Sequence, residues 1–119
     1  MHTALTYASY GWLAFSGTVH FVIDVVSQRI RGKRAPGPET TLFYGLHSSF
    51  ALGQVLYGLL CLWLAWSAPA LVAQPQVTAL SLAAGLGWLA ITFASMSYWQ
   101  PKMNASIFVA LVLAAAVTA

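Results

Sequence analysis

The sequence predicts an all-α integral membrane protein, a four-helix bundle with up-down-up-down topology and both termini outside the cell. Of the 119 residues, 60% are apolar and only 6% are charged, whereas about a quarter of the residues of a soluble domain are charged. Stretches long enough to cross the hydrocarbon core recur along the chain. The basic residues are confined to loops, which is typical of membrane orientation and unlike a nucleic-acid-binding surface.

The first predicted span covers residues 4–26. It begins with Tyr7, Tyr10 and Trp12, which we interpret as an aromatic belt at the outer interface. Positive charges follow this stretch, whereas a cleaved signal peptide carries them before its apolar segment. We therefore expect the span to be retained.

The second predicted span covers residues 42–66 and follows a basic loop that is broken by glycines and prolines. Thr40 or Thr41 is expected to cap this helix, because a hydroxyl at that position accepts a hydrogen bond from a free amide of the first turn. Glu39 lies close by, near the positive end of the helix dipole.

The third and fourth predicted spans cover residues 77–97 and 103–119. An uncharged loop precedes the third span, and Pro101 separates the two because proline cannot continue the hydrogen-bond ladder of a helix. Loops this short make consecutive helices antiparallel neighbours. The chain, residues 1–119, is therefore expected to be a single transmembrane domain.

The distribution of positive charge predicts the orientation. Basic residues occur in the first and third loops, whereas the second loop has none. Cytoplasmic loops are rich in lysine and arginine, so the first and third loops are expected in the cytoplasm. The residues are Arg29, Arg31, Lys33 and Arg34 in the first loop and Lys102 in the third.

Polar residues gather in the cytoplasmic half of the predicted bundle. His20 and Asp24 are four residues apart, on one face of the first span. His47 lies at a similar depth in the second span, about 7–10 Å inside the boundary. Gln54 shares a face with His47, and Ser49 lies between them. The sequence predicts a ligand-binding pocket made of His20, Asp24, His47, Ser49 and Gln54.

Each charged member of this pocket also has a structural interpretation. An ionisable group in hydrocarbon is costly unless it is paired or wetted, and such groups usually mark function. Asp24, however, is close enough to the boundary to form an ordinary ion pair with Arg29 or Arg31. His47 could make a plain interhelical hydrogen bond. The sequence leaves both interpretations open.

Small residues indicate close helix packing. Gly45, Ser49 and Gly53 are spaced four apart, which lets helix backbones approach each other. The partner helix belongs either to the same bundle, to a second copy of the chain or to another membrane protein. The single cysteine, Cys61, excludes an internal disulfide and is expected to pack as a small apolar residue.

Known catalytic signatures are missing, including the P-loop, GxSxG and HExxH. Our leading hypothesis is a non-catalytic membrane subunit or a binder of a lipid or other amphiphile. One alternative is a membrane enzyme for a lipid-soluble substrate, with His20 as the base and Asp24 as its orienting group. Another is a b-type haem protein ligated by His20 and His47. Two histidines and one carboxylate define no metal.

Two stretches resemble an uncharacterised family of small bacterial four-span membrane proteins. They are residues 46–53, Leu-His-Ser-Ser-Phe-Ala-Leu-Gly, and residues 98–101, Tyr-Trp-Gln-Pro. The chain departs from the family pattern because Phe50 occupies the position of the family's histidine and His47 that of its asparagine. The resemblance implies the four-span fold, and it assigns no catalytic residue. We expect the protein in the bacterial inner membrane.

Overall fold

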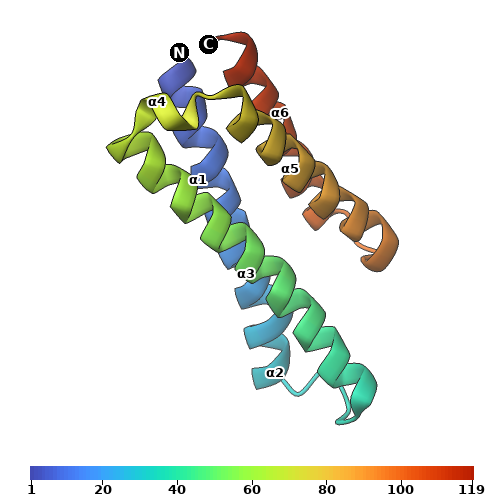
Figure 1. Cartoon of the computed structure of the whole chain (residues 1–119). Helices are drawn as coiled ribbons and strands as arrows, with labels where there is room; N and C mark the ends of the chain where they lie inside the picture. Colours follow the sequence, from blue (N-terminus) through green and yellow to red (C-terminus); the bar gives the residue numbers. More distant parts are fainter.

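The computed structural model describes all 119 residues, and its regular structure is entirely helical. Helix α1 (His2–Phe21) continues through a π-helical stretch, η1 (Val22–Ser27), into the short α2 (Gln28–Ile30). The three elements form one long helical rod that runs beside α3 (Pro38–Ser67), as Figure 1 shows.

The second half of the chain contains α4 (Pro69–Val72), α5 (Pro75–Ser95) and α6 (Gln100–Val117). Helices α3, α4 and α5 each have proline as their first residue. Proline is favoured there because its fixed φ suits the helix. Its missing N–H costs nothing, since an N–H at that position has no acceptor within the helix.

Helix α3 begins at Pro38, four residues before the expected start of the second span, and its N-cap is Gly37. The expectation that Thr40 or Thr41 caps this helix is therefore wrong. Both residues lie within the first turn, where their hydroxyls donate to the carbonyls of Ala35 and Gly37. Glu39 does lie in the first turn, as expected.

The end of α2 is determined by Gly32, which adopts φ 59°. The amide of Lys33 donates to the carbonyl of Gln28, and the amide of Gly32 donates to that of Arg29. This pair of bonds is the Schellman motif, in which a left-handed glycine ends a helix. The first helical rod consequently extends beyond residue 26, the predicted end of the first span.

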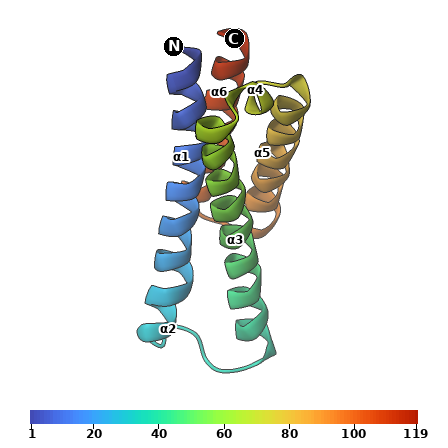
Figure 2. The same cartoon turned by 60° about the vertical axis from the view of Figure 1, so that its left-hand side comes forward.

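Helix α1 packs between α3 and α6, and α5 packs against α6. Consecutive helices were expected to be neighbours, but α3 and α5 meet mainly through long side chains such as Tyr57 and Trp88, whose ring centroids are 6.0 Å apart. The molecule is elongated, 49 × 25 × 19 Å. Both termini lie at one end, and the α2 end of the long hairpin extends beyond the turn between α5 and α6 (Figures 1 and 2).

Three helices are long and apolar enough to cross a membrane: α3, α5 and α6. This finding supports a membrane protein. Helix α1, the fourth expected span, is not among the three. Its buried residues are largely polar, since Thr6, Ser9, Ser16 and His20 all face the interior. The hydroxyls of Thr6, Ser9 and Ser16 donate to carbonyls of their own helix.

Helices α1 and α3 approach each other closely at two glycines. A Cβ atom added to Gly58 would lie 2.8 Å from the amide nitrogen of Ala14, and one added to Gly17 would lie 2.9 Å from the Cβ of Gln54. The predicted small-residue stripe does not form this contact. Gly45 faces open space, Ser49 is exposed and Gly53 lies against Trp88, so the first two remain available to a partner.

The interpretation of Tyr10 as an interfacial belt residue is wrong. Its side chain is buried, and its hydroxyl lies 2.8 Å from that of Ser81, which also bonds the hydroxyl of Tyr57 at 2.9 Å. Trp12 likewise turns inward and donates from Nε1 to the carbonyl of Asn104. Cys61 is buried in the same core as Tyr10, which confirms its expected packing role.

Candidate functional site

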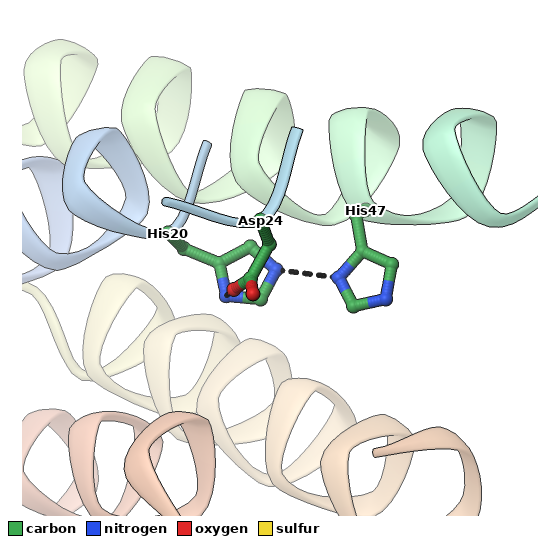
Figure 3. A group of neighbouring side chains, drawn as sticks. All are labelled: His20, Asp24 and His47. Carbon is green, nitrogen blue, oxygen red and sulfur yellow. Dashed lines mark hydrogen bonds and ion pairs between the residues drawn. The ribbon is translucent and has the colours of Figure 1, made fainter. Parts of the chain in front are cut away.

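The structure brings His20, Asp24 and His47 together inside the bundle (Figure 3). His20 lies near the end of α1, Asp24 lies in η1, and His47 lies in the third turn of α3. All three are buried, with exposed fractions of 6%, 7% and 2%. Titratable side chains with so little contact with solvent must be satisfied by one another.

The three side chains form a linear chain of contacts. Nδ1 of His20 lies 3.0 Å from Oδ2 of Asp24, and Nε2 of His20 lies 2.9 Å from Nδ1 of His47. The ion-pair partner of Asp24 is therefore His20, and the interpretation of Asp24 as a boundary pair with Arg29 or Arg31 is wrong. His47 does make an interhelical hydrogen bond, but its partner is a second histidine.

The two imidazole rings meet edge to edge. Their planes differ by 17° and their centroids are 5.0 Å apart. Rings joined through an in-plane nitrogen–nitrogen contact of 2.9 Å have this separation, whereas stacked faces would be closer. The contact is therefore a head-on hydrogen bond, as Figure 3 shows.

The hydrogen-bond network assigns the protons. An ionised carboxylate only accepts hydrogen bonds, so Nδ1 of His20 carries the proton that it donates to Asp24. In a neutral ring, Nε2 of His20 is then an acceptor, and Nδ1 of His47 must donate to it. The Nε2 atom of His47 is left with a lone pair, so the chain ends in a base.

Asp24 lies in a π-helical turn, Val22–Ser27. A π-helical turn contains more residues than an α-helical one, so it changes the faces on which the surrounding residues lie, and such turns are frequent at functional sites. This π-helical turn is not expected from the apolar pattern of the sequence. Its only signal is the run of β-branched residues on both sides of Asp24, since such residues have a slightly lower α-helix propensity.

Aromatic rings pack on the two histidines. The Phe43 centroid lies 4.1 Å from that of His47, and the Phe50 centroid lies 4.9 Å from that of His20. The guanidinium of Arg34 lies 3.4 Å from the Phe43 centroid. A cation over an aromatic face is attracted to it. Phe43 therefore holds the positive charge of Arg34 near His47.

A cavity of about 470 Å³ adjoins the free edge of this cluster. It is lined by Asp24, Arg34 and His47 on one side and by Ser97 and Tyr98 of the α5–α6 turn on the other. The Nε2 atom of His47 has no partner in the protein and points away from His20 (Figure 3). The basic end of the chain is thus placed beside a polar space.

Tyr98 is a site residue that the sequence analysis missed. Its hydroxyl is buried and makes no hydrogen bond, and its side chain lines cavities on both sides of Asp24, together with that residue. Burial and then the charge of Asp24 raise the pKa of Tyr98, so its hydroxyl stays protonated and can donate. Its position in an aromatic turn gave no signal of this role.

Two predicted site residues lie outside the cluster. Ser49 is exposed, and its hydroxyl donates 2.8 Å to the carbonyl of Gly45 on its own helix. Gln54 is buried, but its Cβ packs against Gly17 at the α1–α3 contact, deeper in the bundle. The structure therefore unites three of the five predicted residues: His20, Asp24 and His47.

The ring geometry bears on cofactors. Two axial histidines of a haem lie on opposite sides of the iron and porphyrin plane, and the 2.9 Å contact between His20 and His47 has no room for that plane. The ligand atoms of His20, Asp24 and His47 all lie within 4.8 Å of one another. A metal bound there requires both rings to turn, because their lone pairs must point at the ion.

No protein-family model, curated protein or solved structure matches this chain. The resemblance to a four-span bacterial family therefore stays a prediction. The function is inferred from the geometry of the site alone.

Proposed function

We propose that this chain is a four-span protein of the bacterial inner membrane that binds the polar head of a lipid or other amphiphile at His47. The observation that carries the proposal is the unpartnered Nε2 of His47 beside the 470 Å³ cavity. A buried chain of titratable groups is costly in a membrane, and such groups are usually retained for function.

The position of α1 supports the fourth span. Helix α1 packs between α3 and α6, which are both long and apolar enough to cross a membrane, so it shares their surroundings. The rod of residues 2–30 is about 43 Å long at 1.5 Å per residue, longer than the hydrocarbon core of about 30 Å. The basic α2–α3 loop favours a cytoplasmic position for that end, with both termini outside.

The lining of the cavity indicates the chemistry of the head group. His47 offers a hydrogen-bond acceptor at Nε2, and Tyr98 offers an unsatisfied hydroxyl donor. Arg34 adds a positive charge on the same cavity. We expect a head group that carries both a donor, such as a hydroxyl, and an oxygen acceptor.

A second candidate is a membrane enzyme that uses the same residues for acid–base catalysis. A substrate proton taken up by Nε2 of His47 would allow the Nδ1 proton of His47 to pass to Nε2 of His20. The positive charge would then lie on His20, 3.0 Å from the carboxylate of Asp24, which stabilises it. This continuous route for a proton is the observation that favours the second candidate.

Mass spectrometry of lipids extracted from the detergent-purified protein tests the binding proposal. We expect the wild type to retain one amphiphile. In His47→Ala its binding should be about tenfold weaker, a difference of about 1.4 kcal/mol in binding free energy. The matched control is His2→Ala, because His2 lies at the opposite end and bonds the carbonyl of Ala115. Equal retention by both variants would overturn the proposal.

The same amphiphile separates the two candidates. If the protein is an enzyme, the purified wild type converts the extracted compound to a product, and His20→Ala or Asp24→Asn retains the compound without converting it. A compound that the wild type holds unchanged supports a binder and argues against catalysis.

A further inference from the structure

A groove runs between the first helical rod and α3, on a face to which neither α5 nor α6 contributes. It consists of a polar cavity of about 530 Å³ near the α2–α3 loop and an apolar one of about 490 Å³ farther along. Ser48 lines both cavities, so they adjoin. The groove shares Arg34 with the cavity at His47, but none of His20, Asp24 and His47 lines it.

The spacing of the lining residues shows that the groove is continuous. On the first rod they are Thr18, Phe21, Val25 and Arg29, each three or four residues after the previous one. On α3 the same spacing leads from Thr41 through Ser48 to Val55. Residues three and four apart share a helix face, so each helix contributes one unbroken wall.

The two ends of the groove differ in character. Arg29 and Arg34 line the polar end, and no acidic residue does. Neither arginine has a carboxylate partner, since the only ion pair in the protein joins His20 and Asp24. The other end is lined by apolar residues, which include Phe21, Leu52 and Val55.

We propose that this groove binds one anionic phospholipid of the cytoplasmic leaflet, with its phosphate between Arg29 and Arg34 and an acyl chain along Phe21 and Leu52. The wall from Thr41 to Val55 is about 21 Å long at 1.5 Å per residue. One leaflet with its head groups is about 20–22 Å thick, half of a bilayer of 40–45 Å. The groove therefore matches such a lipid in charge pattern and in length.

Native mass spectrometry with added phosphatidylglycerol, or with phosphatidylcholine of the same acyl chains, tests the charged end. We expect selective binding of phosphatidylglycerol, weakened about fivefold in Arg29→Gln, because one basic side chain is removed from the phosphate. Arg31→Gln is the matched control, since it removes the same charge two residues farther along the chain but Arg31 does not line the groove. Equal weakening in both variants would overturn the proposal.

A second pair of variants tests the acyl end. Leu52 lines the groove and Leu56 does not, although their exposures are similar at 59% and 57%. We expect Leu52→Trp to fill the groove and weaken phosphatidylglycerol binding about fivefold, with Leu56→Trp close to the wild type. If binding is insensitive to Leu52→Trp, or if free glycerol phosphate displaces the lipid, the site accepts only a phosphate and the proposal fails.

The tests at Arg29 and Leu52 are independent of the proposed function at His47, because neither residue lines the cavity at His47. His47→Ala is expected to bind phosphatidylglycerol as the wild type does, because His47 lines neither part of the groove. Loss of this lipid in His47→Ala would mean that a single site serves both ligands, which would overturn the separate groove.

Discussion

Nδ1 of His47 lies 2.9 Å from Nε2 of His20, and this contact connects two helices and gives the site a direction. Asp24 accepts a hydrogen bond from Nδ1, on the far side of the His20 ring, so each histidine in turn donates toward the carboxylate. The chain therefore ends in a lone pair at Nε2 of His47.

Replacement of Asp24 by asparagine is expected to remove the preference for one histidine tautomer. An amide presents both a donor and an acceptor to Nδ1 of His20, whereas a carboxylate presents only acceptors. In the wild type, ¹⁵N NMR of histidine-labelled protein should show one unprotonated Nε2 at His47, and Asp24→Asn should show a mixture. Glu39→Gln, which changes the only other acidic residue, serves as the control. Unchanged tautomers in Asp24→Asn would refute the proton order.

Tyr98→Phe is expected to stabilise the ligand-free protein and to weaken ligand binding. The hydroxyl of Tyr98 is buried without a partner, and such a group costs about 1–3 kcal/mol. Its removal should raise the thermal unfolding midpoint while lowering retention of the co-purified amphiphile. Tyr7→Phe, at an exposed tyrosine, should change neither quantity. A lower unfolding midpoint in Tyr98→Phe would show that the hydroxyl is structural.

Ser81→Ala is expected to destabilise the other end of the bundle. The hydroxyl of Ser81 bonds those of Tyr10 and Tyr57 at 2.8 and 2.9 Å, so its loss leaves one buried and one half-buried phenol without this partner. We expect a loss of about 1–3 kcal/mol, measured by thermal unfolding in detergent. Ser106→Ala is the control, because Ser106 is exposed and bonds only its own helix. Equal stability of the two variants would contradict the network.

Local chemistry made the helices predictable. Apolar stretches gave the helical class, and three of the four expected spans correspond to helices long and apolar enough to cross a membrane. The boundaries follow from local residues as well, since Pro38 starts α3 and Gly32 ends α2. Hydropathy alone nevertheless predicts the start of the second span four residues too late, because it does not reflect the preference of proline for the first helical position.

The composition of the site was only partly predictable, because it depends on helix rotation and on distant elements. The four-residue spacing of His20 and Asp24 is enough to predict their contact. Ser49 follows His47 by two residues, about 200° around the helix, so both cannot face one pocket. Tyr98 lines the same cavity as Asp24 because the α5–α6 turn lies at that level, and the buried hydroxyl of Tyr10 is satisfied by Ser81 of a distant helix. Neither fact is encoded locally.

Gly58→Ala is expected to separate α1 from α3 and to lower the stability of the whole protein. The added Cβ would lie 2.8 Å from the amide nitrogen of Ala14 and 2.9 Å from the carbonyl oxygen of Tyr10, and a backbone contact cannot be relieved by a side-chain rotation. Overpacking of this kind costs about 1–3 kcal/mol. Gly87→Ala is the control, because nothing lies within 4 Å of its Cβ position and alanine favours a helix by up to about 1 kcal/mol over glycine. Thermal unfolding of both variants checks the prediction. A Gly58→Ala protein as stable as Gly87→Ala would mean that α1 and α3 are farther apart in the membrane. Such a result would also contradict the His20–His47 hydrogen bond, which spans the same interface.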